Sequence, residues 1–481
     1  MIEVKDFLKK QFGVEVIENK NNQLKWLSWY KNSNRWLKYQ VTQPNEKRTK
    51  TTKTRHSLNS CKRVCEDWAN LLLNEKTDIV VSKKGGENTS NKDNTYNEKL
   101  HEVLKQNDFW TFANKAIEKV YALGSGAFII GKNQDGTVNI DFVDGTRCYV
   151  MNCNCDEVID CAFENVTYIK GEKYTILNVH IKNKDKKRGY TIYNYLFNKD
   201  GVRISDEQMT ELIQVLPENK VFTKCFAFIT PQNLSGENWD TPFSDSVFAK
   251  AIDANKMIDL AFDSYCNEFI LGKKRIFVAS ELVTYAQNKT DGTTVRVPVF
   301  DENEIVFNLL PEQTNGEVML KEVNMDLRVK DHQSAIQDAL NFFASLCGLG
   351  EKYYMYNQGS VATATQIVSE NSTLFRNIQK QQIAVEKCLK EICTAIFGLM
   401  ETPIDEKAIE VAIQFDDSII EDKAEERKRD LIDVDKGIMS KAEYRAKWYG
   451  ETPEQAQKII DDIDNEEMEK EISKNKEQNL I

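Results

Sequence analysis

The clearest pattern in the chain is an apolar stripe within residues 362–400. Its members recur at steps of three, four and seven residues: Ile367, Leu374, Ile378, Val385, Leu389, Ile392, Ile396 and Leu399. This spacing places them on one face of an α-helix. A helix over 362–400 would be about 57 Å long at about 1.5 Å per residue. Because such helices are stabilised mainly by packing of the apolar face, we expect neighbours along it, from the same chain or from other copies.

Two more helices are predicted before the stripe. Thr241 followed by Pro242 combines a capping residue with a first-position proline, which predicts a helix over 241–272. A second helix, over 329–347, is indicated by an apolar face and ends at glycine. That face consists of Ile336, Leu340 and Phe343. Between the helices, alternating residues in 273–325 predict a small α/β insertion.

The N-terminal part is expected to combine helices with an antiparallel sheet. Amphipathic stretches predict helices over 56–76, 97–106 and 109–123, and turn residues divide 127–230 into short strands. An aromatic cluster favours a role in the core over a binding surface: Trp26, Trp29, Tyr30 and Trp36. The basic, Thr-rich segment 45–55 is interpreted as a solvated loop, in preference to a phosphate-contacting arm.

A possible nucleotide site lies at the start of the sheet region. Gly126, Gly131 and Lys132 have the spacing of a P-loop, but Asn133 replaces the Ser or Thr that holds magnesium. The order is also reversed, because a P-loop follows a strand and opens a helix, whereas here a helix ends at Gly124 and a strand begins. We therefore favour a strand over nucleotide binding.

Composition and charge narrow the classes of function. A length of 481 residues predicts two to four domains, and a hydrophobic content of 41% is enough for packed cores. The formal net charge of −11 argues against a protein that binds nucleic acid tightly over a broad surface. It does not exclude a protein past which nucleic acid slides. No signal-like segment and no run of about eighteen apolar residues occurs, so neither secretion nor membrane spanning is expected, and we place the chain in a cytoplasm.

The 11 cysteines are interpreted as reduced, mostly buried thiols. Four of them raise the alternative of a zinc site, but they lack paired CxxC spacing, so packing between strands is favoured: Cys148, Cys153, Cys155 and Cys161. Near the C-terminus, Gly437 is expected to stop one helix, and Ser440 with Glu443 to form a capping box for the next.

Several local sequences stand in a characteristic order: SLN at 57–59, KRVCEDWA at 62–69, GSGAF at 124–128, TATQIVSENS at 363–372 and FDDSII at 415–420. With the order of helices and insertion, they resemble the portal proteins of tailed bacteriophages, in the branch from phages of Gram-positive hosts. The resemblance covers nearly the whole chain. It implies an elongated α+β portal fold with wing, stem, clip and helical crown.

The implied divisions are a wing over 1–240, a stem helix over 241–272, a clip over 273–328, a second stem helix over 329–347, a tunnel loop over 348–361, a long wing helix over 362–400 and a helical crown over 401–481. On this mapping the tunnel loop meets DNA at the channel constriction. Its expected contact residues are Lys352, Tyr353, Tyr354, Met355, Tyr356, Asn357 and Gln358. The loop is expected to be exposed and mobile.

The resemblance also implies partners. A homo-oligomeric ring, a dodecamer, is expected at one capsid vertex of the virion, after assembly in the bacterial cytoplasm. Double-stranded DNA passes through it nonspecifically, and the terminase large subunit, head-completion and tail adaptor proteins, and major capsid and scaffolding proteins bind it. No catalytic residue, metal, cofactor or membrane contact is expected.

Two alternatives come from other classes. An enzyme would use the P-loop-like segment 126–132, which the Asn133 departure disfavours. Another oligomeric head-tail structural or adaptor protein is disfavoured by the long insertion between paired helices, since such proteins are usually much shorter.

Overall fold

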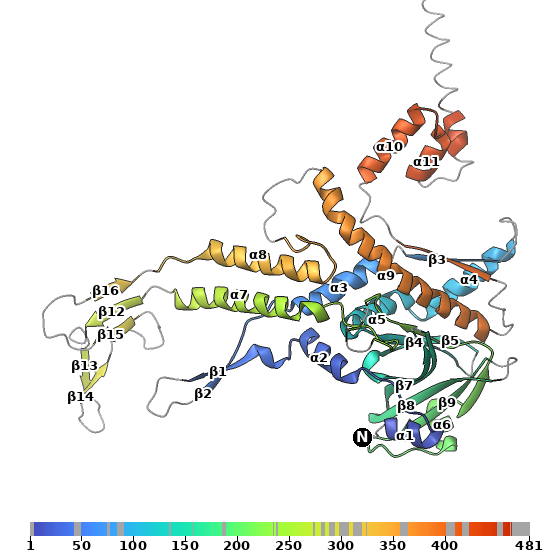
Figure 1. Ribbon diagram of the computed structural model, residues 1–481, viewed down its shortest axis with the longest axis horizontal. Helices are drawn as coiled ribbons and strands as arrows, with labels where there is room; N and C mark the ends of the chain where they lie inside the picture. Colours follow the sequence, from blue (N-terminus) through green and yellow to red (C-terminus); the bar gives the residue numbers. More distant parts are fainter. Residues whose placement is uncertain are drawn as a thin grey trace, which may run out of the picture. The chain divides into compact units, whose positions relative to one another are not determined.

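The computed structural model describes residues 4–42, 50–74, 77–83, 91–133, 136–155, 157–184, 189–233, 235–236, 239–272, 275–279, 284–287, 294–297, 307–310, 320–323, 325–355, 364–400, 409–415, 423–449, 456–461 and 463. They form two compact units, Met1–Gln414 and Phe415–Ile481, and each is described by itself. Helices and antiparallel sheets are mixed in the first unit, which confirms the α+β fold class (Figure 1).

The N-terminal helices agree with the amphipathic pattern. They are α1 (Val4–Phe12), α2 (Lys20–Tyr30), α3 (Ser60–Leu72), α4 (Asn91–Gln106) and α5 (Phe109–Leu123). The helix expected over 56–76 begins and ends closer to its centre, because Asn59 has a φ of +53° and Leu73 is extended. Trp26 and Trp29 are buried, as expected of core anchors.

Two antiparallel sheets follow, as predicted for 127–230. The larger has the order β10-β9-β8-β7-β6, and the smaller has the order β11-β4-β5. Their bounds are β4 (Gly126–Lys132), β5 (Val138–Asp144), β6 (Cys148–Asn154), β7 (Glu157–Ile169), β8 (Glu172–Lys182), β9 (Tyr190–Phe197), β10 (Glu218–Val221) and β11 (Phe226–Ile229), with α6 (Asp206–Ile213) after β9. Val4 and Leu8 of α1 pack into the core formed on the larger sheet.

The P-loop-like segment is β4, the central strand of the smaller sheet. It follows α5, which ends at Gly124 with a φ of +74°, so its glycines do not connect a strand to a helix. A Cβ on Gly126 would lie 2.6 Å from the Phe142 ring, which explains the glycine by close packing.

The four cysteines of the possible zinc site lie on or beside β6 and β7. Cys148 and Cys161 are buried between strands, whereas Cys155 is exposed. Burial raises the pKa of the Cys148 thiol. Within the described ranges, no group of three or more His, Cys, Asp or Glu residues is placed to hold a metal ion.

Helices α7 (Ile252–Leu271) and α8 (Val329–Leu346) run side by side in the first unit (Figure 1). The prediction that the first helix begins at Thr241 is wrong. Residues 241–248 pack as irregular chain against the end of α5, where Val247 N and Ser246 Oγ donate to the Tyr121 carbonyl at 3.0 and 3.1 Å. These tertiary contacts override the local capping signal. The predicted ends near Gly272 and Cys347 are confirmed.

Between α7 and α8 the described residues form five short strands: β12 (Arg275–Ala279), β13 (Thr284–Gln287), β14 (Thr294–Val297), β15 (Phe307–Leu310) and β16 (Leu320–Val323). Strands β15, β12 and β16 make one sheet, and β13 pairs with β14. The strands of the insertion are confirmed, whereas a helix in it is not among the described residues.

The long helix is confirmed as α9 (Ala364–Leu399), with 36 residues. It packs on β11, β4 and α3. From Leu374 onward the predicted stripe is buried, including Ile392 at 1% exposure and Ile396 at 0%. After α9 the chain returns to the N-terminal part, where β17 (Ile409–Gln414) pairs with β3 (Asp78–Lys83). This pairing was not predicted.

Part of the segment expected to be a solvated loop is instead a β-hairpin. Strand β1 (Lys38–Thr42) pairs antiparallel with β2 (Lys50–Thr54), and residues 43–49 lie outside the described ranges. The three threonines of β2 favour the extended strand. The charge pattern that suggested a loop is compatible with a strand exposed to solvent along its whole length.

The second unit contains α10 (Lys423–Asp435) and α11 (Lys441–Tyr449). Gly437, with a φ of +71°, follows the first helix as predicted. The capping box is confirmed, because Glu443 N donates to Ser440 Oγ at 3.1 Å and Ser440 N donates to Glu443 Oε2 at 2.9 Å. No described helix in either unit is long and apolar enough to cross a membrane.

Candidate functional site

The candidate site is the segment where α8 ends and residues 348–355 begin. The backbone N–H groups of Cys347, Gly348 and Leu349 donate to carbonyls of the last turn of α8 at 3.0–3.1 Å. Gly348 has a φ of +81°, a conformation that residues with a side chain rarely adopt. The glycine therefore ends the helix and sets the direction in which the following segment leaves.

Helix α3 holds both ends of this segment. Trp68 Nε1 donates to the Cys347 carbonyl at 3.1 Å, and Tyr354 Oη donates to Asp67 Oδ2 at 2.7 Å. The Asp67 side chain is 8% exposed and also pairs with Arg63 at 3.1 Å. A hydrogen bond to a buried carboxylate is stronger than one between neutral groups, so this contact fixes the tyrosine firmly.

Helices α8 and α9 complete the attachment. Gln337 Nε2 of α8 donates to the Tyr354 carbonyl at 2.8 Å, and Asn377 Nδ2 of α9 donates to the Gly348 carbonyl at 2.8 Å. We call residues 347–354, with these contacts, the loop root. Helices α3, α8 and α9 therefore all contact the loop root, and the chain that follows starts from a fixed position.

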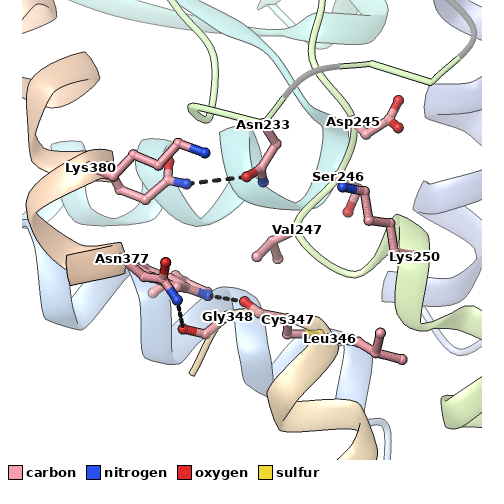
Figure 2. Close-up of a pocket in the computed structure, with 12 residues that line it drawn as sticks. Asn233, Asp245, Ser246, Val247, Lys250, Leu346, Cys347, Gly348, Asn377 and Lys380 are labelled. Atoms are coloured by element: carbon pink, nitrogen blue, oxygen red, sulfur yellow. Dashed lines mark hydrogen bonds between the residues drawn. The ribbon is translucent and has the colours of Figure 1, made fainter. Parts of the chain in front are cut away.

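A polar cavity of about 90 Å³ lies beside the loop root (Figure 2). Figure 2 shows Asn377 reaching Gly348, with Lys380 and Asn233 facing each other across the cavity. The lining residues are Trp68, Asn233, Asp245, Ser246, Val247, Lys250, Leu346, Cys347, Gly348, Asn377, Lys380 and Gln381.

Gln381 connects this cavity to the core. Its Oε1 accepts from Tyr121 Oη and from Gln232 N, both at 2.8 Å, and its Nε2 donates to Asn233 Oδ1 at 3.3 Å. Tyr121 in turn stacks on Trp68, with ring centroids 5.9 Å apart. The loop root is therefore joined to α5 and α9 through one continuous set of contacts.

The structure separates the predicted DNA-contacting residues into three groups. Lys352 and Met355 are exposed, Tyr353 and Tyr354 are half-buried, and Tyr356, Asn357 and Gln358 lie outside the described residues. The expectation that Tyr354 is an exposed loop side chain is wrong, because it packs between α3 and α8. Burial, followed by the charge of Asp67, raises the pKa of Tyr353 to about 12 and raises that of Tyr354 further.

The residues that hold the loop root were not predicted. Trp68 and Asp67 lie about 280 positions earlier than their partners, which no local pattern reveals. The only sequence signal was the pair of glycines after α8, of which Gly348 and Gly350 both have positive φ.

The solvent-facing side of α8 carries acidic and small polar residues in its first half, and the large apolar Phe342 and Leu346, 60% and 51% exposed, near its end. Asp331, Ser334, Asp338 and Ser345 are exposed and follow one another at helical spacing toward the loop root. Lys330, in the first turn, is the one lysine or arginine of α8. The exposed stripe therefore has acidic character between Asp331 and Asp338.

At the other end of α8, Arg328 joins the two helices. Its guanidinium donates to both oxygens of Glu268 on α7, at 3.2 and 3.0 Å. The hydrogen bond from Arg328 lowers the pKa of Glu268 from 4.5 to about 2. Because the folded-state pKa is depressed, this contribution to stability is present above about pH 4.5 and is lost as the pH falls toward 2.

Comparison with known proteins identifies the class to which this fold and loop root belong. The model of a family of phage portal proteins matches residues 15–470, nearly the whole chain. The chain belongs to this family, described as "Phage portal protein, SPP1 Gp6-like". The predicted resemblance to phage portal proteins is thereby confirmed, whereas the narrower assignment to phages of Gram-positive hosts stays a prediction.

Curated protein sequences gave no match. Among solved structures, the chain is similar to one described as "Neck of native GTA particle computed with C12 symmetry". The sequence identity is 10% and the TM-score 0.40, over 92% of this chain and 97% of that chain.

Proposed function

We propose that this portal protein forms a ring of identical subunits, a dodecamer, at one capsid vertex of the virion. Double-stranded DNA enters through its channel during packaging and leaves through it during ejection. The observation that carries the proposal is the exposed polar stretch of α8 with Asp331, Ser334 and Asp338, on the helix that leads to the fixed loop root. We place this stretch on the channel side of the ring.

The stripe suits a channel for physical reasons. Each phosphate neutralised by Lys or Arg adds binding free energy through counterion release, and a wall that gripped the phosphates would resist sliding. Asp331 and Asp338 repel phosphate, and the serines offer only weak contacts. A channel wall of this kind therefore binds DNA weakly and allows it to slide.

The remaining segments take the parts of a portal. Residues 1–240 and α9 form the wing, α7 and α8 the stem, and 273–328 the clip, which binds the terminase large subunit during packaging and head-completion or tail adaptor proteins afterwards. Residues 401–481 lead into and form the crown, except that β17 pairs with β3 of the wing. The wing contacts the major capsid and scaffolding proteins, and the ring assembles in the cytoplasm of the host bacterium.

The first test reverses the charge of the stripe. Asp331→Lys with Asp338→Lys is expected to leave rings visible by electron microscopy but to reduce DNA packaging in vitro at least tenfold, because the new lysines bind phosphates. The matched control, Glu98→Lys with Glu102→Lys, changes two exposed acids of α4 and is expected to package normally. Normal packaging by the stripe variant, or a purified protein that never forms rings, would reject the proposal.

The second test concerns residues 352–358, which we propose touch the DNA backbone loosely. Replacing 355–358 with Gly/Ser residues keeps Tyr354 and the loop root intact. We expect rings that package DNA but release it more readily, measured as DNA retained in filled heads. Unchanged packaging and retention would eliminate this role for the loop.

A further inference from the structure

The polar cavity beside the loop root is large enough for one small ion and too small for a nucleotide. Its volume is about 90 Å³, whereas pockets that hold organic ligands measure roughly 300–1,000 Å³. Because a water molecule takes up about 30 Å³ in the liquid, the cavity has room for about three waters or for one polyatomic ion. The polar groups of its wall decide which of these it favours.

Several polar groups of the wall are engaged in holding the wall together. Asn377 Nδ2 donates to the Gly348 carbonyl. Gln381 has hydrogen bonds at both its Oε1 and its Nε2, and Ser246 Oγ donates to the Tyr121 carbonyl. These contacts fix the shape of the cavity and leave its charged groups to be considered separately.

Two lysines of the wall lack a partner of this kind. Neither Lys250 nor Lys380 has a hydrogen bond or an ion pair with the residues that the structure describes. Figure 2 shows both side chains directed toward the cavity, Lys250 from the turn that precedes α7 and Lys380 from α9. Asn233 lies between them. Its Oδ1 accepts from Gln381 Nε2, so its Nδ2 is oriented as a donor.

The carboxylate among the lining residues is engaged elsewhere. Asp245 Oδ1 accepts from Ser235 Oγ at 3.0 Å, and Asp245 Oδ2 accepts from Gly236 N at 3.1 Å. Figure 2 shows this carboxylate turned away from the cavity. Two positive charges therefore face the cavity with no negative partner in the described part of the chain. Because charges in a partly enclosed space are screened less than in open water, an anion between them would lower the free energy.

We propose that this cavity binds one tetrahedral oxyanion of the phosphate class. Lys250 and Lys380 supply charge-assisted hydrogen bonds, and Asn233 Nδ2 donates a further one. The bound anion links α9 to the chain that precedes α7, next to Gly348, and so holds the loop root more firmly. Free phosphate and a phosphate of the DNA backbone present the same oxygen atoms and are the two sources. The site does not depend on the proposed ring.

Titration with inorganic phosphate tests the site. The melting temperature of the full-length protein is expected to rise with phosphate and to level off, compared with chloride at equal ionic strength. Lys250→Gln with Lys380→Gln should raise the apparent Kd for phosphate by roughly tenfold or more, because two charged donors are lost. Lys105→Gln with Lys199→Gln changes two exposed lysines elsewhere and should bind like the parent. Equal binding by all three proteins would indicate an adventitious ion only and overturn the proposal.

A charge-retaining variant separates charge from local packing. Lys250→Arg with Lys380→Arg is expected to keep phosphate binding, since a guanidinium also binds phosphate. Circular dichroism establishes that the Gln and Arg variants are folded. Loss of binding in both folded variants would show that the two positions act through packing and would overturn the role given to their charges.

Hydrogen exchange tests the link to the loop root. Backbone amides of 347–349 are expected to exchange more slowly in phosphate than in chloride at equal ionic strength. The Gln variant should show no such difference. Exchange at 347–349 that is the same in both salts for the parent would overturn the link between the anion and the loop root.

A double-stranded oligonucleotide distinguishes the two sources of the anion. Phosphate bound to the parent is followed by ³¹P NMR while the duplex is added. Displacement of the phosphate would support the site with the DNA backbone as its source, and retention would support it with free phosphate as its source. If neither phosphate nor the duplex bound at the two lysines, the proposal would be overturned, whether or not the protein forms rings.

Discussion

Helices α7 and α9 bury different mixtures of side chains: mainly apolar ones on α9, and polar residues together with the apolar Ile258 on α7. Against the body of the protein α9 places Leu389, Ile392 and Ile396, whereas α7 places Asn255, Asp259 and Asp263 there and turns Met257 and Leu260 outward. An apolar face toward the core is the usual arrangement for a helix stabilised by its own chain. Helix α7 departs from this arrangement, because it buries polar residues and exposes Met257 and Leu260.

The two helices also differ in how their buried polar groups are satisfied. Gln381, on α9, has hydrogen bonds at both its Oε1 and its Nε2. On α7, Asn255 Nδ2 donates to Asp259 Oδ2 at 3.3 Å, but Asn255 Oδ1 and Asp259 Oδ1 have no hydrogen-bond partner in the described structure. A buried polar atom without a partner costs free energy, so these two oxygens of α7 carry a cost that Gln381 of α9 does not.

The largest expected effect tests the core role of α9. Leu389→Ala removes a side chain that is 2% exposed, and it should reduce the free energy of unfolding by about 2–5 kcal/mol through lost burial and a cavity. Urea denaturation followed by circular dichroism measures the change. Ile383→Ala is the control on the same helix, since Ile383 is 62% exposed, and its effect should stay within about 0.5 kcal/mol. Equal losses for both would contradict the assigned orientation of α9.

A smaller loss is expected at the satisfied polar group. Gln381→Ala leaves the Tyr121 hydroxyl and the Gln232 amide without their acceptor, at a cost of about 1–3 kcal/mol in the same measurement. Gln379→Ala, at an exposed position of α9, provides the comparison and should be nearly neutral. If Gln381 were replaceable without cost, the contact between α5 and α9 would not be a stabilising one.

The smallest effect is expected from a substitution in α7, which should increase stability at neutral pH, whereas the two substitutions in α9 reduce it. Burial raises the pKa of Asp259 from 3.8 to about 6, so the folded protein holds a proton that the unfolded chain has released between these values. Stability therefore falls as the pH rises from about 4 to 6. Asp259→Asn should remove this decrease and make the variant the more stable form at pH 7.5, measured as melting temperature against pH. If the melting temperature of the variant changed with pH in parallel with that of the parent, Asp259 would not be the cause of the pH dependence.

Structural features set by residues close together in the sequence were predicted, whereas features set by contacts between distant residues were not. The stripe of α9, the glycine that ends α8 and the capping box at Ser440 are local patterns, and each was confirmed in place. The start of α7 was misplaced, because contacts with Tyr121 hold residues 241–248 out of the helix.

The position of the loop root was predicted, but the hydrogen bonds that hold it were not. The glycines located the loop root, whereas its bonds to Trp68, Asp67 and Asn377 join residues far apart in the sequence. The burial of the polar Asn255 and Asp259 on α7 was also not predicted. Whether residues 352–358 meet DNA stays a prediction.

The pairing of β17 with β3 limits where the chain can be shortened. Strand β3 holds Ile79 and Val81, each 1% exposed, and β17 covers its edge from Ile409 to Gln414. A truncation after residue 414 keeps both strands and removes only the second compact unit. A truncation before Ile409 would leave β3 without the one strand that pairs with it among the described residues, and its unpaired backbone groups would be a template for aggregation. Expression of the first unit alone therefore has a sharp C-terminal limit, set by a strand that arrives more than 300 residues after its partner.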